Sequence, residues 1–142
     1  MKKLACAFYL FFTVTGCKSG HPAAREIDDR DMDVQVVLLD STPGNGNTYK
    51  ARLIPDKKLF DEKDAVSKNA MIYKMDSCFY LQSGTKRVYA SLVQPVANGI
   101  TGTFEYLLEF EKNDGNSWDF VYQDKYINHK KYSLKLNQDI PR

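Results

Sequence analysis

From residue 34 onward, apolar and polar residues follow one another in short runs that predict β-strands. Residues 34–39 (VQVVLL) and 49–54 (YKARLI) are rich in β-branched or aromatic residues, and the turn sequence PGNGN separates them at 43–47. In residues 104–111 (FEYLLEFE) every second residue is apolar, as expected for a strand with one face in the core and one in water. We therefore expect the three intervening acids to point into solvent: Glu105, Glu109 and Glu111.

The remaining pattern completes the prediction of a small all-β domain. Further strands are predicted at residues 78–82, 87–94, 118–122 and 132–136, with turn sequences between them that include NDGN at 113–116. Residues 55–70 are weakly amphipathic and predict one short helix, and residues 71–74 predict a short edge strand. We expect a mainly all-β fold, an antiparallel β-sandwich of about seven or eight strands, transthyretin-like or immunoglobulin-like, with one short helix in a connection.

The first residues of the chain have the pattern of an export signal. Lys2 and Lys3 precede an almost unbroken apolar run from Leu4 to Val14. A helix that spans a bilayer needs about twenty apolar residues, so this run of roughly eleven is too short to span. The pattern therefore predicts a secretory signal peptide at residues 1–16.

The signal ends on Val14-Thr15-Gly16-Cys17, which resembles the bacterial lipobox, an aliphatic residue and two small residues before a cysteine. The resemblance implies cleavage after Gly16, a diacylglyceryl group on Cys17 Sγ and an acyl chain such as palmitate on the new amine. Two or three acyl chains together give stable membrane attachment. The alternative is an ordinary cleaved signal that leaves Cys17 as a thiol.

The residues after Cys17 bear on location and on the start of the fold. Lys18 stands where lipoproteins of the inner membrane usually carry aspartate, which implies the outer membrane, and the first acid is Glu26, which favours a periplasm-facing domain. Residues 17–33 lack an apolar period, so we expect a lipidated flexible tether there and the sandwich domain at 34–142.

Charge and cysteine content exclude some classes of partner and chemistry. Removal of residues 1–16 takes away Lys2 and Lys3, so 18 basic residues balance 18 acids in the mature chain. A neutral chain argues against nucleic acid as a partner. Cys78 would be the sole unmodified cysteine, so no intramolecular disulfide is expected, and its apolar neighbours predict a small buried side chain.

The chain lacks the residue combinations on which common catalytic sites depend. Its two histidines are His21, in the expected tether, and His129, in a polar turn, and neither has a predicted nucleophile or acid beside it. No cysteine and histidine spacing matches a zinc site. We therefore predict a protein that is not an enzyme, with no metal and no cofactor beyond the covalent lipid on Cys17.

Binding remains the expected activity, through a membrane anchor and a protein partner in the envelope. Loops on a rigid sandwich often carry recognition, and tyrosine is favoured at protein interfaces. Tyrosines that are only half-buried at strand ends explain the same composition. The candidate partner-binding residues are Tyr89, Asn98, Gly99, Tyr126 and Tyr132.

Residues 87–99 (RVYASLVQPVANG) and 118–132 (WDFVYQDKYINHKKY) are similar in style to accessory lipoproteins of type VI secretion systems. The resemblance implies a sandwich tethered to the outer membrane that holds a trans-envelope complex. Two other functions remain open on the residues alone. One is a lipoprotein that binds a glycan or a small molecule, and the other is an immunity or inhibitor lipoprotein.

Overall fold

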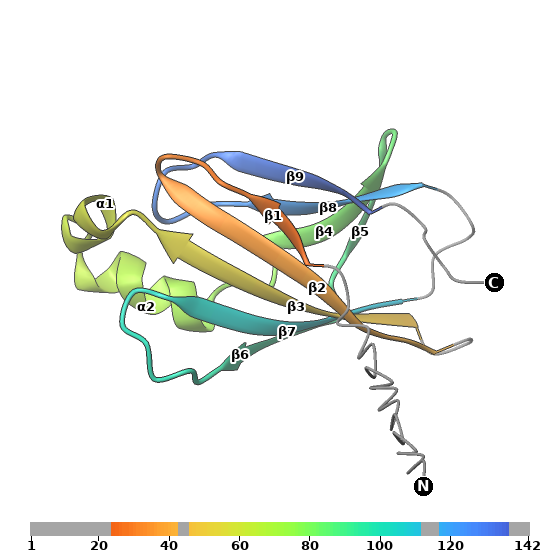
Figure 1. Cartoon of the computed structure of the whole chain (residues 1–142), viewed down its shortest axis with the longest axis horizontal. Helices are drawn as coiled ribbons and strands as arrows, with labels where there is room; N and C mark the ends of the chain where they lie inside the picture. Colours follow the sequence, from red (N-terminus) through yellow and green to blue (C-terminus); the bar gives the residue numbers. More distant parts are fainter. Residues whose placement is uncertain (1–23, 43–45, 112–116, 137–142) are drawn as a thin grey trace, which may run out of the picture.

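The computed structural model describes residues 24–42, 46–111 and 117–136. Within these ranges two antiparallel sheets stack into a small β-sandwich, and two short helices lie at one end (Figure 1). This confirms the predicted fold class, with nine strands and two helices among the described residues. In spatial order, the first sheet contains β1 (Arg25–Ile27), β2 (Met32–Thr42), β3 (Gly46–Pro55), β7 (Phe104–Phe110) and β6 (Leu92–Val96). The second contains β5 (Lys86–Tyr89), β4 (Phe79–Ser83), β8 (Trp118–Gln123) and β9 (Lys131–Leu136).

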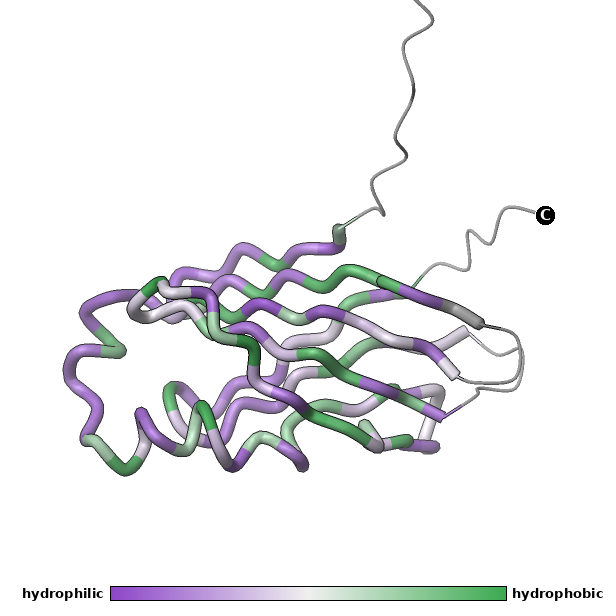
Figure 2. Tube along the Cα trace, turned by 90° about the horizontal axis from the view of Figure 1, so that it is seen from below, coloured by the Kyte–Doolittle hydropathy of each residue, from purple (hydrophilic) through white to green (hydrophobic). Residues whose placement is uncertain are grey.

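The core lies between the sheets and is rich in aromatic rings. On β7, Tyr106, Leu108 and Phe110 are buried, and β8 buries its own alternate residues against them. Polar and apolar positions alternate along the strands in Figure 2, as a sheet with one covered face requires. The rings of Phe79 and Tyr122 stack across the β4–β8 pair with centroids 5.2 Å apart. Cys78 is fully buried, as predicted.

The structure corrects the predicted boundary between tether and domain. Residues 25–27 form β1, which pairs with β2 through Glu26 and Gln35, and β2 itself begins at Met32. Ile27 packs against the core. The prediction of a flexible tether over 17–33 is therefore wrong from Arg25 onward, because so short a strand has no period of its own and depends on its neighbour for hydrogen bonds.

The connection between β3 and β4 is more helical than predicted. It contains α1 (Lys57–Asp61) and α2 (Ala65–Tyr73), so the edge strand expected at 71–74 is wrong. Each helix begins after an aspartate whose carboxylate accepts a backbone N–H: Asp56 Oδ1 from Leu59 at 3.0 Å and Asp64 Oδ1 from Ser67 at 2.7 Å. The apolar pattern of residues 55–70 is weak because this stretch holds two short helices, each with its own cap and separated by a turn, and not one continuous helix.

Glu105 is the exception on β7. Glu109 and Glu111 are exposed as predicted, but only 5% of Glu105 is exposed, because Lys50 Nζ and Arg52 Nη2 on β3 lie 2.9 and 2.6 Å from its carboxylate. The polar face of the first sheet thus holds a covered ion-pair cluster and not three solvated acids.

Several predicted features lie outside the described residues. These are the signal peptide, the lipobox residues Val14, Thr15, Gly16 and Cys17, the first residues of the turn at 43–47 and the whole of 113–116. Neither helix in the described part of the chain is long and apolar enough to cross a membrane.

Candidate functional site

A groove of about 690 Å³ lies between α2 and the loop that joins β6 to β7. Both elements sit at the helical end of the sandwich (Figure 1). Phe104 and Tyr106 of β7 contribute to its lining, together with Ile72 and Tyr73 of α2 and the loop residues that follow Val96. We call this feature the α2 groove.

Tyrosine hydroxyls hold the C-terminal end of α2 in place. The last carbonyls of a helix have no partner within the helix. Tyr106 donates its hydroxyl hydrogen to the carbonyl of Met71, and Tyr126 donates to the carbonyl of Lys74 at 2.6 Å. Burial raises the pKa of Tyr106, so its hydroxyl stays protonated and remains a donor. One wall of the α2 groove is therefore fixed to the sandwich through hydrogen bonds.

The opposite wall is the β6–β7 loop, which its own side chains keep in shape. Asn98 Oδ1 accepts from the Ile100 N–H at 2.9 Å, and Asn98 Nδ2 donates to the Thr103 carbonyl at 3.1 Å. Gly99 has a φ of 70°, a left-handed conformation that favours glycine. These contacts place Ile100 where 59% of the residue is exposed.

The rims of the α2 groove expose unusually large apolar side chains. Tyr73 is 76% exposed, Ile100 59%, Val96 38% and Ile72 36%, and all four line the groove. Single exposed apolar residues need no explanation, but several gathered around a hollow are typical of an interaction site.

The groove carries little charge. Lys68 Nζ lies 5.1 Å from the centre of the Phe60 ring and donates to the Asp61 carbonyl at 3.2 Å. The carboxylate of Glu105 is neutralised by the cations of β3. No His, Cys or Asp is among the described lining residues. The surface is thus suited to receive apolar groups.

The predicted partner-binding residues do not form one site. Asn98 and Gly99 line the α2 groove. The hydroxyl of Tyr126, in contrast, donates a hydrogen bond to the carbonyl of Lys74 at the end of α2. Tyr132 is only 4% exposed, so its predicted place at the surface is wrong. Tyr89 is 49% exposed but packs on Tyr80 of the second sheet, with ring centroids 5.3 Å apart.

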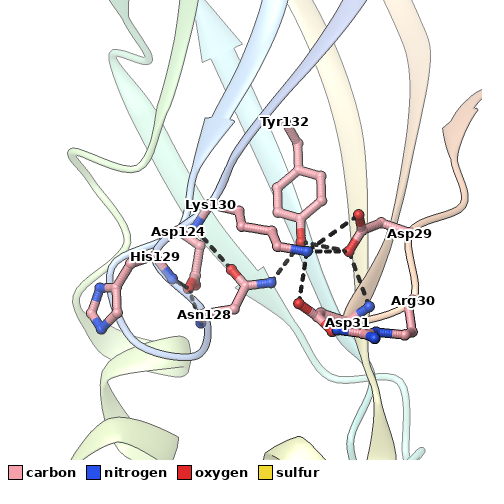
Figure 3. Close-up of polar contacts among 8 residues, drawn as sticks. All are labelled: Asp29, Arg30, Asp31, Asp124, Asn128, His129, Lys130 and Tyr132. Carbon is pink, nitrogen blue, oxygen red and sulfur yellow. Dashed lines mark hydrogen bonds and ion pairs between the residues drawn. The ribbon is translucent and has the colours of Figure 1, made fainter.

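Tyr132 belongs instead to a polar contact between the two sheets, shown in Figure 3. Lys130 Nζ lies 2.7 Å from Asp31 Oδ2 and 3.1 Å from Asp29 Oδ1 in the β1–β2 turn. Tyr132 Oη accepts from Asn128 Nδ2 at 2.6 Å and donates to Asp29 Oδ1 at 3.4 Å. We call the three charged residues the Lys130 latch, because they join the turn after β1 to the start of β9.

A buried carboxylate shapes the loop beside the latch. Asp124 is 1% exposed and accepts backbone N–H groups from Ile127, Asn128 and His129 at 2.9, 2.6 and 2.8 Å. It also accepts the Tyr122 hydroxyl at 2.7 Å, so its oxygens are satisfied within the fold. His129 is exposed and has a φ of 59°. Its backbone N–H donates to Asp124, and this hydrogen bond holds the shape of the loop.

A metal site is not evident in the part of the chain that the structure describes, where no three His, Cys, Asp or Glu side chains come together. Tyr73 and Ile100, the most exposed residues of the groove, are not among the five residues predicted to bind a partner, although Ile100 lies in the same loop as Asn98 and Gly99. The N-cap residue Asp64 is the sequence signal that could have placed Tyr73 on a helix. Comparison of the chain with protein-family models, curated proteins and solved structures finds no match.

Proposed function

We propose that this protein is a lipid-anchored, non-catalytic lipoprotein of the outer membrane that binds a protein partner through the α2 groove. The observation that carries the proposal is the ring of exposed apolar side chains around the groove, above all Tyr73 and Ile100. The lipobox-like sequence that ends on Cys17 supplies the anchor. A periplasm-facing structural subunit of a trans-envelope assembly, such as a type VI secretion system, fits both features.

Two properties of the groove favour a protein partner. Its walls are fixed by the contacts of Tyr106 and Asn98, so little order has to be gained on binding. Its rims combine an aromatic side chain with aliphatic ones, the composition typical of the centre of a protein interface.

Site-specific photocrosslinking in intact cells tests the proposal. A photoreactive residue in place of Tyr73 or Ile100 should give a discrete adduct with one envelope protein. The matched control is Tyr89, an aromatic residue that is also exposed but lies on the other sheet. Adducts from Tyr89 alone, or none from the groove positions, contradict the assignment.

A small apolar molecule is the second candidate occupant, and the size of the groove favours it. Ligand pockets usually measure about 300–1,000 Å³, and the α2 groove, at about 690 Å³, falls in this range. A screen of lipid-like and glycan ligands by thermal shift separates the two functions. Stabilisation by a small molecule that Ile100→Asp abolishes would support ligand binding over a protein partner.

A further inference from the structure

Two exposed leucines lie beside the point where the chain enters the sandwich. Arg25, the first residue of β1, pairs with Val36 of β2. Leu38 lies two residues beyond Val36 on β2 and is 39% exposed, and Leu39 is 49% exposed. Among the described residues, β1 pairs with β2 only from Val34 to Val36, so no described strand pairs with Leu38 or Leu39 on this side of β2.

The backbone at these leucines departs from regular pairing. Leu38 pairs with Tyr49 and Asp40 with Thr48, which leaves Leu39 out of the β2–β3 ladder. Such a bulge twists the edge and prevents simple addition of another strand. The leucines therefore suit an apolar contact more than strand pairing. We call these two residues and the stretch of β2 that carries them the Leu38–Leu39 edge.

The chain that precedes β1 limits what this edge can touch. Residues 18–24 separate Cys17 from Arg25. An extended chain spans about 3.3–3.6 Å per residue, so Cys17 lies at most about 29 Å from the start of β1. If Cys17 carries the lipid anchor, as the proposed function requires, the bilayer surface is within reach of the Leu38–Leu39 edge.

We propose that the Leu38–Leu39 edge rests on the lipid bilayer surface. Interfacial contacts of this kind bury apolar side chains about 5–10 Å into the boundary between headgroups and acyl chains. In the first sheet, β1 and β2 lie at one edge and β6 at the other. Because β6 and β7 line the α2 groove, this orientation turns the groove away from the membrane and towards a periplasmic partner.

Fluorescence quenching by the lipid tests the contact. The acylated mature protein is bound to phosphatidylethanolamine and phosphatidylglycerol vesicles whose acyl chains carry bromine, with a fluorophore on Leu39→Cys or Leu92→Cys. Leu92 is the matched control, since it is 39% exposed on β6 at the opposite edge. Cys78 does not compete for the label, because it is fully buried and its pKa is raised to about 11.

We expect the label at position 39 to be quenched and the label at position 92 to keep its intensity. Equal quenching at both positions, or none at position 39 in vesicle-bound protein, overturns this inference and leaves the anchor intact. A blue shift at position 39 without quenching indicates a second protein copy on the edge and also overturns it. A mature chain whose mass shows an unmodified Cys17 overturns both the anchor and the inference. If Leu39→Cys does not fold, Leu38→Cys replaces it.

Discussion

At the scale of single residues, Glu105 shows how a solvent-facing strand position becomes part of the structure. Burial opposes ionisation of Glu105, but the hydrogen bonds from Lys50 and Arg52 outweigh it and lower the pKa of the carboxyl group. A carboxylate with a lowered pKa stabilises the folded state above its unfolded pKa of about 4.3. That contribution is lost as the pH falls through the folded pKa.

We predict that Glu105→Gln lowers the free energy of unfolding by about 1–2 kcal/mol at pH 7, since two cations lose their shared anion. The difference from the wild type should shrink as the pH falls through the lowered folded pKa of Glu105 and vanish once the carboxyl group is protonated in both states. Urea denaturation at pH 7 and at a series of acidic pH values measures it. Glu109→Gln, on the same strand but exposed, is the control and should change little.

At the scale of elements, α2 depends on groups from the sandwich more than on its own sequence. It has nine residues, too few for a stable isolated helix. Only Ala70 and Met71 are buried on it, so contacts at its C-terminal end carry much of its stability. The walls of the α2 groove thus depend on Tyr106 and Tyr126.

Tyr106→Phe should therefore reduce stability by about 1–2 kcal/mol, because the buried Met71 carbonyl loses its donor. Amide hydrogen exchange in α2 should accelerate more than exchange in β8. Tyr126→Phe removes the hydroxyl that bonds the Lys74 carbonyl at a more exposed position, so it should have a smaller effect. Uniform acceleration throughout the domain would argue against a local role for Tyr106.

The Lys130 latch is the second contact at this scale. The backbone N–H of Asp31 and the Lys130 ammonium lower the pKa of Asp29, and Lys130 lowers the pKa of Asp31. The two carboxylates raise the pKa of Lys130 in turn. The latch therefore stabilises the folded state at pH values above the unfolded aspartate pKa. This stabilisation is lost as the pH falls through the lowered pKa values of Asp29 and Asp31. It is lost again at high pH, where Lys130 deprotonates.

Lys130→Gln should lower the melting temperature at pH 7, and this effect should shrink as the pH falls through the lowered pKa values of Asp29 and Asp31 and both aspartates become protonated. Thermal unfolding followed by circular dichroism measures the difference across this range. The control is Lys131→Gln, because the neighbouring Lys131 ammonium contacts Gln82 Oε1 at 2.9 Å and no carboxylate that the structure describes. A pH-independent loss in Lys130→Gln would indicate that packing, and not charge, is responsible.

At the scale of the whole molecule, the domain begins well before the first plain strand pattern. A chain that starts at Ala24 should keep the stability of the mature protein. One that starts at Met32 lacks β1 and Asp29 and should lose about 1–2 kcal/mol or more, because the side chain of Ile27, which packs partly buried against the core, is removed. Urea denaturation of the two truncated chains decides where the fold begins. Equal stability of the two truncated chains would show that residues 25–31 belong to the tether and not to the folded domain.

The membrane anchor is expected to be separable from the fold. Cys17→Ser should move the protein from the membrane to the soluble periplasmic fraction, because without acyl chains a neutral mature chain has no electrostatic attraction to lipid and two leucines alone are too small an apolar contact to hold it there. Its melting temperature should match that of the acylated form in detergent. Cell fractionation and thermal unfolding test the two parts, and an unfolded Cys17→Ser protein would contradict the division into anchor and domain.

What the sequence determined by itself is local. The alternation in 104–110 and 118–122 and the burial of Cys78 follow from side chains that can satisfy only one environment, and they led to the correct fold class. Tertiary structure decided the rest. The three residues of β1, the burial of Glu105 and the inward place of Tyr132 depend on partners 9 to 103 positions away in the chain, which no local period records. The α2 groove exists only because the end of one helix and a loop that begins about 24 residues later meet on the same sheet, so it depends on the pairing of the strands and not on any motif.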